Sequence, residues 1–403
     1  MNRFAVYIHI PFCTVKCGYC DFNAYAGMDR LKIDYGQALI REIESWATQL
    51  GKGVVTSIAF GGGTPGEMPA AAIREVLEVV RGTWAVEDGA EVSLEANPGT
   101  SNGDYFRELR GAGVTRLSLG AQSFNARELA FLDRIHSVKA IEASARAARS
   151  SRFESVSLDL IYGVEGQDIR DWLWSLREAV ALKPDHISCY ALTVEEGTGL
   201  GARVARGEIS LPNPDVLADM YEAASEELAH QGFEHYELSN WAQRGHRSRH
   251  NIVYWTGGQY LGIGAGAHGY LDGIRYENVA HPRRYVEVCR EGPLKRKAFD
   301  SDWAGGCAIA QGTRPTRSEE IVDFISLGLR LVGGFAVSEF EQRLGVQMSN
   351  VVGPLISEVL DSGVLEIDGG MMRLTPRGRL LHSDVASRLI ADLQVTPPEA
   401  QES

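Results

Sequence analysis

FAVYIHIPFCTVKCGYC, residues 4–20, joins a strand-like run to a loop that holds three cysteines within eight positions. Residues 4–10 are mostly apolar and β-favouring, so they predict a strand. The three cysteines of the loop are Cys13, Cys17 and Cys20. Clustered thiols in a chain without a disulfide-rich composition indicate metal or redox chemistry. The other three cysteines are Cys189, Cys289 and Cys307, each far from any further thiol in the sequence. We expect these three thiols to be buried and to bind no metal.

Strand-like runs alternate with helical patterns in the first half of the chain. After the first strand, further runs lie at about 54–60, 91–95, 115–120, 155–161 and 185–191. Between them, apolar residues recur at helix spacing, for example within 35–50 and 73–84. Strands that alternate with helices form parallel βα units. The pattern therefore predicts an α/β fold, a partial (βα)6 barrel of the TIM type.

The texture of the sequence changes after about residue 305. Helical patterns at 318–332 and 349–361 precede two short strand-like runs, which Asp368 and Gly369 join as a hairpin turn. This order predicts a small winged-helix-like α+β domain. The expected divisions are a barrel at 1–230, a histidine-containing region that closes the barrel mouth at 231–304, the winged-helix-like domain at 305–394 and a disordered tail at 395–403.

The composition is that of an ordinary globular protein with a net negative charge. The chain has 403 residues, a formal net charge of −13, 44% hydrophobic residues and 44 glycines. Residues 313–393 hold eight arginines and no lysine against eleven acidic residues, which argues against nucleic-acid binding. No apolar run approaches the ~18–20 residues that cross a membrane. We expect a cytoplasmic protein, and we leave open a membrane-associated state and a homodimer.

Polar and glycine-rich segments follow the predicted strands at the end where barrels of this type carry their chemistry. They are Pro11–Cys13, Gly61–Pro65, Glu95–Pro98, Gly120–Ser123 and Asp159. Because the carboxyl ends of parallel strands meet at one face of a barrel, we expect these segments to form one site.

The cysteine loop, residues 13–20, offers three thiolates and no obvious fourth ligand. Structural zinc usually takes four ligands, and no further Cys or His lies at zinc-finger spacing. Iron–sulfur clusters take cysteine thiolates, ordinarily four for a four-iron cluster, so three would leave one iron open to another ligand. The loop therefore favours an iron–sulfur cluster. A zinc loop and incidental thiols are the alternatives.

Several longer motifs lie at the predicted strand ends. They are YIHIPFC at 7–13, GGGTP at 61–65, EANP at 95–98, QSF at 122–124 and DLIYG at 159–163. Together with the cysteine loop, they resemble the radical S-adenosylmethionine (SAM) superfamily. Within it, nearly the whole chain is similar to the oxygen-independent coproporphyrinogen III oxidase branch, and most similar to the HemW-type heme chaperones.

This resemblance implies a [4Fe-4S] cluster on Cys13, Cys17 and Cys20, with SAM bound beside it. The residues that match SAM-binding positions are Tyr7, Tyr19, Gly62, Gly63, Thr64, Glu95, Gln122, Arg134, Asp159 and Ile263. Glycine suits such a site because bare backbone lets a ligand approach closely. Alternatives stay open, since the tyrosines can be packing residues and Asp159 can form a structural ion pair with Arg134 or a lysine.

A histidine motif, His250-Asn251-x-x-Tyr254-Trp255, lies further along the chain. In HemW-type chaperones this motif is linked to heme binding, so the resemblance implies a heme site at these four residues. Imidazole is an ordinary axial ligand of heme iron, and the aromatic pair offers apolar surface. The arginine-rich segment 244–249 suits heme propionates. A structural histidine and a solvated loop are the alternatives.

The resemblance leaves two main functions, besides a radical SAM enzyme for another substrate. The first is a heme chaperone that binds the cluster, SAM and heme and delivers heme to a membrane respiratory protein. The alternative is the oxidase, which would decarboxylate propionate side chains by radical chemistry. The histidine motif favours the chaperone. The segment before Cys13, which has only twelve residues, favours it as well. So does Phe22, because it stands where the oxidases carry a fourth cysteine. We therefore expect the chain to lack oxidase activity.

Overall fold

The computed structural model describes residues 2–100, 102–291, 305–352 and 355–391, which form two compact units. The first, called the barrel unit, contains residues up to 234 together with 239–250 and 259–313. The second, called the C-terminal unit, contains residues 235–238, 251–258 and the chain from 314 onward. The tail predicted at 395–403 lies outside the described residues.

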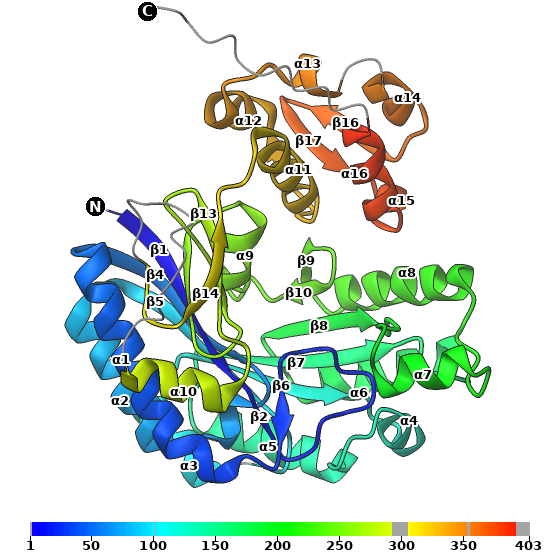
Figure 1. Cartoon of the computed structure of the whole chain (residues 1–403). Helices are drawn as coiled ribbons and strands as arrows, with labels where there is room; N and C mark the ends of the chain where they lie inside the picture. The colour runs from blue at the N-terminus through cyan, green and yellow to red at the C-terminus, as the bar shows by residue number, and fades with distance from the viewer. Residues whose placement is uncertain (1, 101, 292–304, 353–354, 392–403) are drawn as a thin grey trace, which may run out of the picture. The chain divides into compact units, whose positions relative to one another are not determined.

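Six parallel strands build the barrel unit, in the order in which they occur along the chain (Figure 1). They are β1 (Asn2–Ile10), β4 (Gly53–Gly62), β5 (Ala85–Ala96), β6 (Arg116–Gln122), β7 (Ser155–Tyr162) and β8 (His186–Ala191). Each contains a run that the sequence marked as a strand, so the predicted partial (βα)6 barrel is confirmed.

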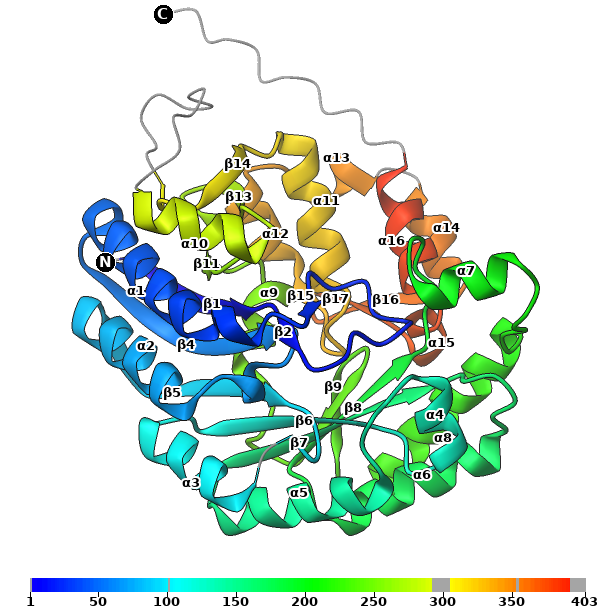
Figure 2. The same ribbon diagram turned by 60° about the horizontal axis from the view of Figure 1, so that its bottom comes forward.

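Helices line the outer side of this curved sheet (Figure 2). They are α1 (Lys32–Leu50), α2 (Ala70–Thr83), α3 (Gly103–Ala112), α5 (Val138–Ser150), α6 (Ile169–Ala181) and α8 (Pro214–His230). Two short helices, α4 (Ala126–Phe131) and α7 (Gly199–Ala205), lie beside the cysteine loop instead and line a small cavity together with Gly18. On α1, the buried residues Leu39, Ile43 and Trp46 recur at helix spacing and pack in the main core. Local signals set the ends of helices: the Asn102 side chain accepts from Tyr105 N at the start of α3, and Gly113, with φ of 100°, follows its end.

A second group of strands extends the sheet beyond β1. Its members are β11 (Tyr260–Ile263), β12 (His268–Leu271), β13 (Ile274–Asn278) and β14 (Ile309–Thr313), with α10 (Pro282–Glu291) between the last two. Strand β11 pairs in parallel with β1, so that Ile8 faces Ile263, and the later strands continue antiparallel. At the other end, β10 (Asn240–Ala242) pairs antiparallel with β8. The short strands β2 (Phe12–Cys13) and β3 (Tyr25–Ala26) pair across the base of the cysteine loop.

A buried carboxylate ties α1 to this second group of strands. Glu42 accepts hydrogen bonds from Gly264 N at 2.9 Å, from Asn278 Nδ2 at 2.7 Å and from the Tyr285 hydroxyl at 2.6 Å. Burial raises the pKa of Glu42 to about 7, although these bonds oppose the shift. The network fixes the backbone that follows Ile263, one of the predicted SAM contacts.

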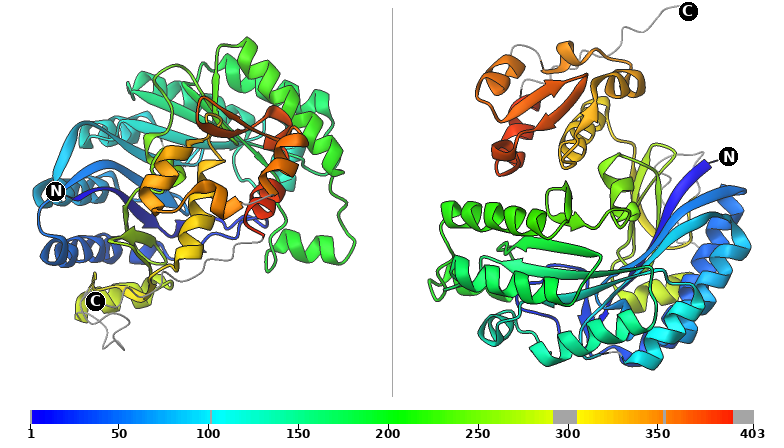
Figure 3. Two further views of the ribbon diagram at one scale, coloured as in Figure 1. Left: turned by 90° about the horizontal axis from the view of Figure 1, so that it is seen from above. Right: turned by 180° about the vertical axis from the view of Figure 1, so that it is seen from behind.

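The C-terminal unit has its own hydrophobic core and its own sheet, in the order β15-β17-β16. Figure 3 shows this unit in yellow to red, with helices packed around the sheet. Its elements are α11 (Arg317–Gly328), β15 (Phe335–Ala336), α12 (Val337–Leu344), α13 (Met348–Val352), α14 (Leu355–Asp361), β16 (Leu365–Asp368), β17 (Met371–Leu374), α15 (Pro376–Arg379) and α16 (His382–Ile390). Helices followed by a hairpin confirm the winged-helix-like α+β domain. Within the helix expected at 349–361, the described residues are helical and form α13 and α14, and residues 353 and 354 lie outside the described residues. Among the described residues, no helix is long and apolar enough to cross a bilayer.

Candidate functional site

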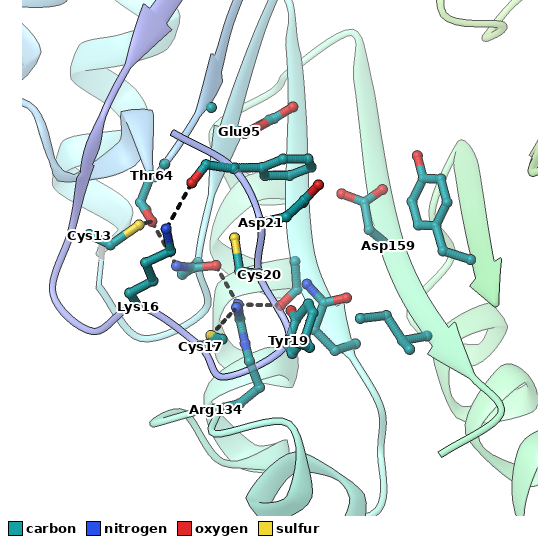
Figure 4. Close-up of a pocket in the computed structure, with 18 of the residues that line it drawn as sticks. Cys13, Lys16, Cys17, Tyr19, Cys20, Asp21, Thr64, Glu95, Arg134 and Asp159 are labelled. Carbon is teal, nitrogen blue, oxygen red and sulfur yellow. Dashed lines mark hydrogen bonds between the residues drawn. The ribbon is translucent and has the colours of Figure 1, made fainter. Parts of the chain in front are cut away.

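The cysteine loop opens into a cavity of about 410 Å³ at the carboxyl ends of the barrel strands (Figure 4). Cys13, Cys17 and Cys20 all line it, and each is partly exposed and unbridged. The other predicted site residues on its wall are Tyr19, Gly62, Gly63, Thr64, Glu95, Gln122, Arg134 and Asp159. The barrel thus gathers in one place residues that lie up to 146 positions apart in the chain.

Two of the three thiols have a polar side chain of the cavity wall beside them. Cys13 Sγ lies 3.4 Å from the Thr64 hydroxyl, and Arg134 Nη1 donates to Cys17 Sγ over 3.4 Å. Burial raises the pKa of Cys13 and Cys20. In the described part of the chain, no three His, Cys, Asp or Glu side chains converge on a point that one ion could occupy. An iron–sulfur cluster does not need such a point, because each thiolate binds a different iron.

Bare backbone forms one wall of the cavity. Gly62 has φ of 110°, which side chains rarely adopt, and a Cβ atom there would collide with the His9 ring. A Cβ atom on Gly63 would lie 2.7 Å from Phe12 O and 2.9 Å from Ile10 O. The Gly63 and Thr64 amides bind Ile10 O and Phe12 O, at 2.8 and 2.7 Å. Glycine is therefore required at both positions by the packing of the protein itself, and both residues line the cavity.

Two carboxylates face the cavity from neighbouring parts of the barrel. Burial raises the pKa of Glu95 to about 7, and the charge of Asp159 adds to the shift. Asp159 accepts hydrogen bonds from three serine hydroxyls, at 2.6, 2.7 and 3.3 Å, those of Ser188, Ser118 and Ser157. Burial also raises the pKa of Asp159, which these hydroxyls oppose. Glu95 and Asp159 therefore place several acceptor oxygens on the cavity wall, which suits a ligand with hydrogen-bond donors.

Arg134 binds the wall of the cavity rather than Asp159. Its Nη2 atom donates to Gly120 O over 3.1 Å and also to Asn97 Oδ1, while Nη1 reaches Cys17. The alternative ion pair between Asp159 and Arg134 is therefore not formed, because serines satisfy the carboxylate. Gln122, at the end of β6, has φ of 65° and lines the cavity beside Arg134.

Sequence reasoning did not assign roles to several residues of the wall. Asn97 donates to the Thr64 hydroxyl at 2.9 Å and so connects Arg134 to the neighbour of Cys13. Phe22 and Tyr190 give the wall an exposed apolar part, with 60% and 42% of each residue accessible. Asn97 lies within the EANP motif, so the sequence did offer a signal that it belongs to the site. Tyr190 follows from the barrel geometry alone, since it lies one residue before the carboxyl end of β8.

Two predicted SAM contacts lie behind the wall instead of on it. The Tyr7 hydroxyl bonds His9 Nδ1 at 3.0 Å, and His9 Nε2 bonds Asn23 O at 2.9 Å. Burial raises the pKa of Tyr7 above its usual range. Ile263 is fully buried in β11, next to β1. Both positions support the strand that carries the cysteine loop.

The histidine motif lies apart from the residues that line this cavity. Helix α9 (Arg249–Trp255) carries it, and His250 is only 2% exposed. His250 Nδ1 bonds the Ser57 hydroxyl at 2.9 Å, and its backbone N–H donates to Glu91 at 3.1 Å. Burial lowers the pKa of His250 to about 3. The ring is thus neutral and held inside the barrel unit.

The rest of the motif belongs to the C-terminal unit, and its arginine neighbours are engaged. In that unit, Arg330 lies over the Trp255 ring, 4.2 Å from its centroid. Asn251 and Tyr254 are half-buried. Arg247 pairs with Glu234 at 3.2 Å, and Arg249 donates to Gly89 O. Within the C-terminal unit, Asn251, Tyr254 and Trp255 are thus each partly exposed, whereas His250 in the barrel unit is enclosed.

Comparisons with known proteins agree with this geometry. Residues 7–179 match the radical SAM superfamily, and residues 316–381 match the HemN C-terminal domain. Heme chaperone HemW of Mycobacterium tuberculosis is 40% identical over 390 residues, with 96% of this chain and 95% of that protein covered. Heme chaperone HemW of Escherichia coli is 32% identical over 399 residues and is covered to 98%.

A solved structure shares the fold as well. The coproporphyrinogen III oxidase HemN of Escherichia coli superposes with a TM-score of 0.80 at 23% identity, covering 97% of this chain and 91% of that one. The fold and the three-cysteine loop define a protein of the radical SAM superfamily, which implies a [4Fe-4S] cluster and SAM. Within that superfamily, the chain belongs to the HemW family of heme chaperones.

Proposed function

We propose that this protein is a heme chaperone that holds a [4Fe-4S] cluster and SAM in the barrel cavity and passes heme to a membrane respiratory protein. The carrying observation is the cavity itself, where three partly exposed, unbridged thiols face bare glycine backbone and two carboxylates. The names of relatives that match it over almost their full length support the chaperone role.

In this proposal, Cys13, Cys17 and Cys20 ligate three irons of the cluster. A bound cluster would supply electrons at low potential and one iron without a protein ligand. The protein's part is to hold the three thiolates and to exclude bulk water. It also keeps Arg134 beside Cys17, where the positive charge of the guanidinium offsets the negative charge of the thiolates. Phe22, beside Cys20 in sequence, covers part of the wall with an apolar ring.

SAM carries an ammonium group, a sulfonium group, a carboxylate and ribose hydroxyls. We assign the cationic groups and hydroxyls to the acceptor oxygens of Glu95 and Asp159, and the carboxylate to Arg134. The amide of Gln122 adds a donor and an acceptor at the end of β6. The methionine part is assigned to the cavity wall at Gly62 and Gly63, next to Cys13 and Thr64.

Heme is assigned to the histidine motif. The neutral imidazole of His250 is the protonation state that binds iron, but the residue is only 2% exposed, so the ring can reach iron only after the groups that cover it move. Tyr254 and Trp255 offer aromatic surface, and Arg247 and Arg249 suit propionates once they release Glu234 and Gly89. Heme binding at this motif therefore requires a local rearrangement.

A paired assay tests the function. Anaerobically reconstituted protein is titrated with heme and followed by absorption, and the same preparation is supplied with coproporphyrinogen III, SAM and a reductant. We expect a stable heme complex and no protoporphyrinogen IX. The matched variants are His250→Ala and His268→Ala, since His268 is an exposed histidine away from the motif. Loss of the heme spectrum only in His250→Ala supports the proposal, whereas turnover of coproporphyrinogen III identifies an oxidase.

A further inference from the structure

Both backbone polar groups of Gly18 are fixed by distant parts of the barrel unit. Its N–H donates to Asp133 Oδ2 at 3.0 Å, and its carbonyl oxygen accepts from Leu200 N at 2.7 Å. Gly18 lies between two of the loop thiols, directly after Cys17. The loop is therefore held in place at its middle, although it is otherwise a surface segment without regular structure there.

The contact depends on glycine at this position. A Cβ atom on Gly18 would lie 2.5 Å from Asp133 Oδ2, closer than real Cβ contacts allow. On the other side, Gly199 at the start of α7 lies within ordinary van der Waals reach, since a Cβ atom there would lie 3.4 Å from Gly18 O. The missing Gly18 side chain therefore lets the Asp133 carboxylate approach the loop backbone, while α7 packs against the loop from another direction.

The backbone of Asp133 also determines where the next residue points. Asp133 has φ of 53°, a left-handed conformation that aspartate tolerates better than most residues. It follows α4 and makes the turn after which Arg134 Nη1 reaches Cys17 Sγ, 3.4 Å away. The Asp133 carbonyl oxygen is itself 3.9 Å from the same sulfur. One residue thus sets two contacts to Cys17 and one to Gly18.

We infer that Asp133 is a positioning residue that holds the cysteine loop in its ligating arrangement before a cluster arrives, through its carboxylate on Gly18 and through the turn that delivers Arg134 to Cys17. This inference rests on the proposed cluster site and adds to it a residue that does not line the cavity. Partners of metal ligands commonly change metal affinity by roughly 10–100-fold, because they orient the ligands.

Three variants separate the carboxylate from the backbone turn. Asp133→Gly keeps the left-handed backbone conformation but removes the oxygen that accepts from Gly18 N. Asp133→Asn keeps a side-chain oxygen that can accept this bond, and asparagine also tolerates the left-handed conformation. The matched control is Asp272→Gly, because Asp272 has a similar φ of 51° in a hairpin turn and does not line the cavity. All three are made in the full chain.

The first measurement uses protein without a cluster. Hydrogen exchange of the peptide that spans the cysteine loop is followed by mass spectrometry. We expect faster exchange at Gly18 in Asp133→Gly, and wild-type exchange in Asp133→Asn and Asp272→Gly. Unchanged exchange in Asp133→Gly overturns the inference, and this outcome does not depend on whether a cluster is bound.

The second measurement uses reconstituted protein. Iron retained against a chelator and the midpoint potential of the cluster are compared among the variants. We expect Asp133→Gly to lose iron roughly 10–100-fold faster and the conservative Asn variant to recover retention. Equal retention and potential in Asp133→Gly and wild type overturn the inference. Failure of the wild type itself to take up a four-iron cluster contradicts the proposed function instead.

Discussion

The Nδ1 atom of His250 lies 2.9 Å from the Ser57 hydroxyl oxygen, and both residues are almost completely buried. Because burial lowers the pKa of His250 to about 3, the ring is neutral at physiological pH. The folded protein therefore resists protonation of this residue, whereas the unfolded chain does not.

The first prediction is a pH-dependent loss of stability that His250→Gln reduces. Between pH 6.5 and 3 the unfolded state binds one more proton at this position, so stability falls as the pH falls, by up to about 1.4 kcal/mol per pH unit. Urea unfolding of the cluster-free protein at pH 7 and 5 measures it. We expect the wild type to lose about 2 kcal/mol more than His250→Gln. The exposed-site variant His268→Gln should follow the wild type, and equal slopes for wild type and His250→Gln contradict the prediction.

The second prediction concerns SAM affinity. The pKa of Glu95 is raised to about 7, so its carboxylate is neutral below that pH and ionised above it. Because SAM carries cationic groups, affinity should rise between pH 6 and 8, by at most about tenfold per pH unit from this group. Isothermal titration calorimetry measures the dissociation constant. Glu95→Gln should bind more weakly at pH 8 and show less pH dependence. An unchanged pH profile in the variant would count against Glu95 as a SAM contact.

The third prediction compares two glycines. Gly63→Ala places a methyl group against the backbone of Phe12 and Ile10, so it should destabilise the protein by about 1–3 kcal/mol and weaken SAM binding. Gly82, in helix α2, has open space around it, so Gly82→Ala should stabilise the fold by about 0.5–1 kcal/mol. Urea unfolding and SAM titration check both. Similar effects of the two substitutions on stability and on SAM binding would contradict the prediction.

The fourth prediction divides the six cysteines by reactivity. In cluster-free protein, Cys13, Cys17 and Cys20 are partly exposed, whereas Cys189, Cys289 and Cys307 are buried. Burial raises the pKa of Cys189, and a hydrogen bond with Cys307 together with burial raises that of Cys289. Each unit of pKa above the ambient pH lowers the thiolate fraction about tenfold.

Timed alkylation followed by peptide mass spectrometry measures this difference. The three loop cysteines should react first under native conditions, and the three buried cysteines only after unfolding. Addition of the cluster should protect the loop cysteines alone. Early labelling of Cys289 or Cys307 would show that the region around α10 opens more readily than its packing indicates.

The fold could be predicted because its signals are local and repeated. Strands such as β4 and β7 are rich in β-branched and other apolar residues and are buried along most of their length, and helices such as α1 show regular apolar spacing. The wall of the cavity was predicted from strand ends, since parallel strands must present those ends on one face.

The remaining features depend on contacts that spacing does not encode. The burial of His250 follows from Ser57 and Glu91, which lie more than 150 positions away. The roles of Asp133 and Gly18 arise from a turn in one segment and close packing in another. The spacing of the cysteines therefore predicted a metal-binding loop, whereas the contacts that support this loop could be identified only from the three-dimensional structure.

Strand β1 lies between β4 and β11, and Ala5 pairs with Tyr260. During synthesis at ~5–20 residues per second, the second of these neighbours emerges roughly 12–50 s after the first strand. For that interval one edge of β1 has unpaired backbone groups, directly before the loop with three thiols. Strand edges of this kind pair readily with other chains. The nascent polypeptide is thus most vulnerable to misassociation at the segment on which cofactor loading depends.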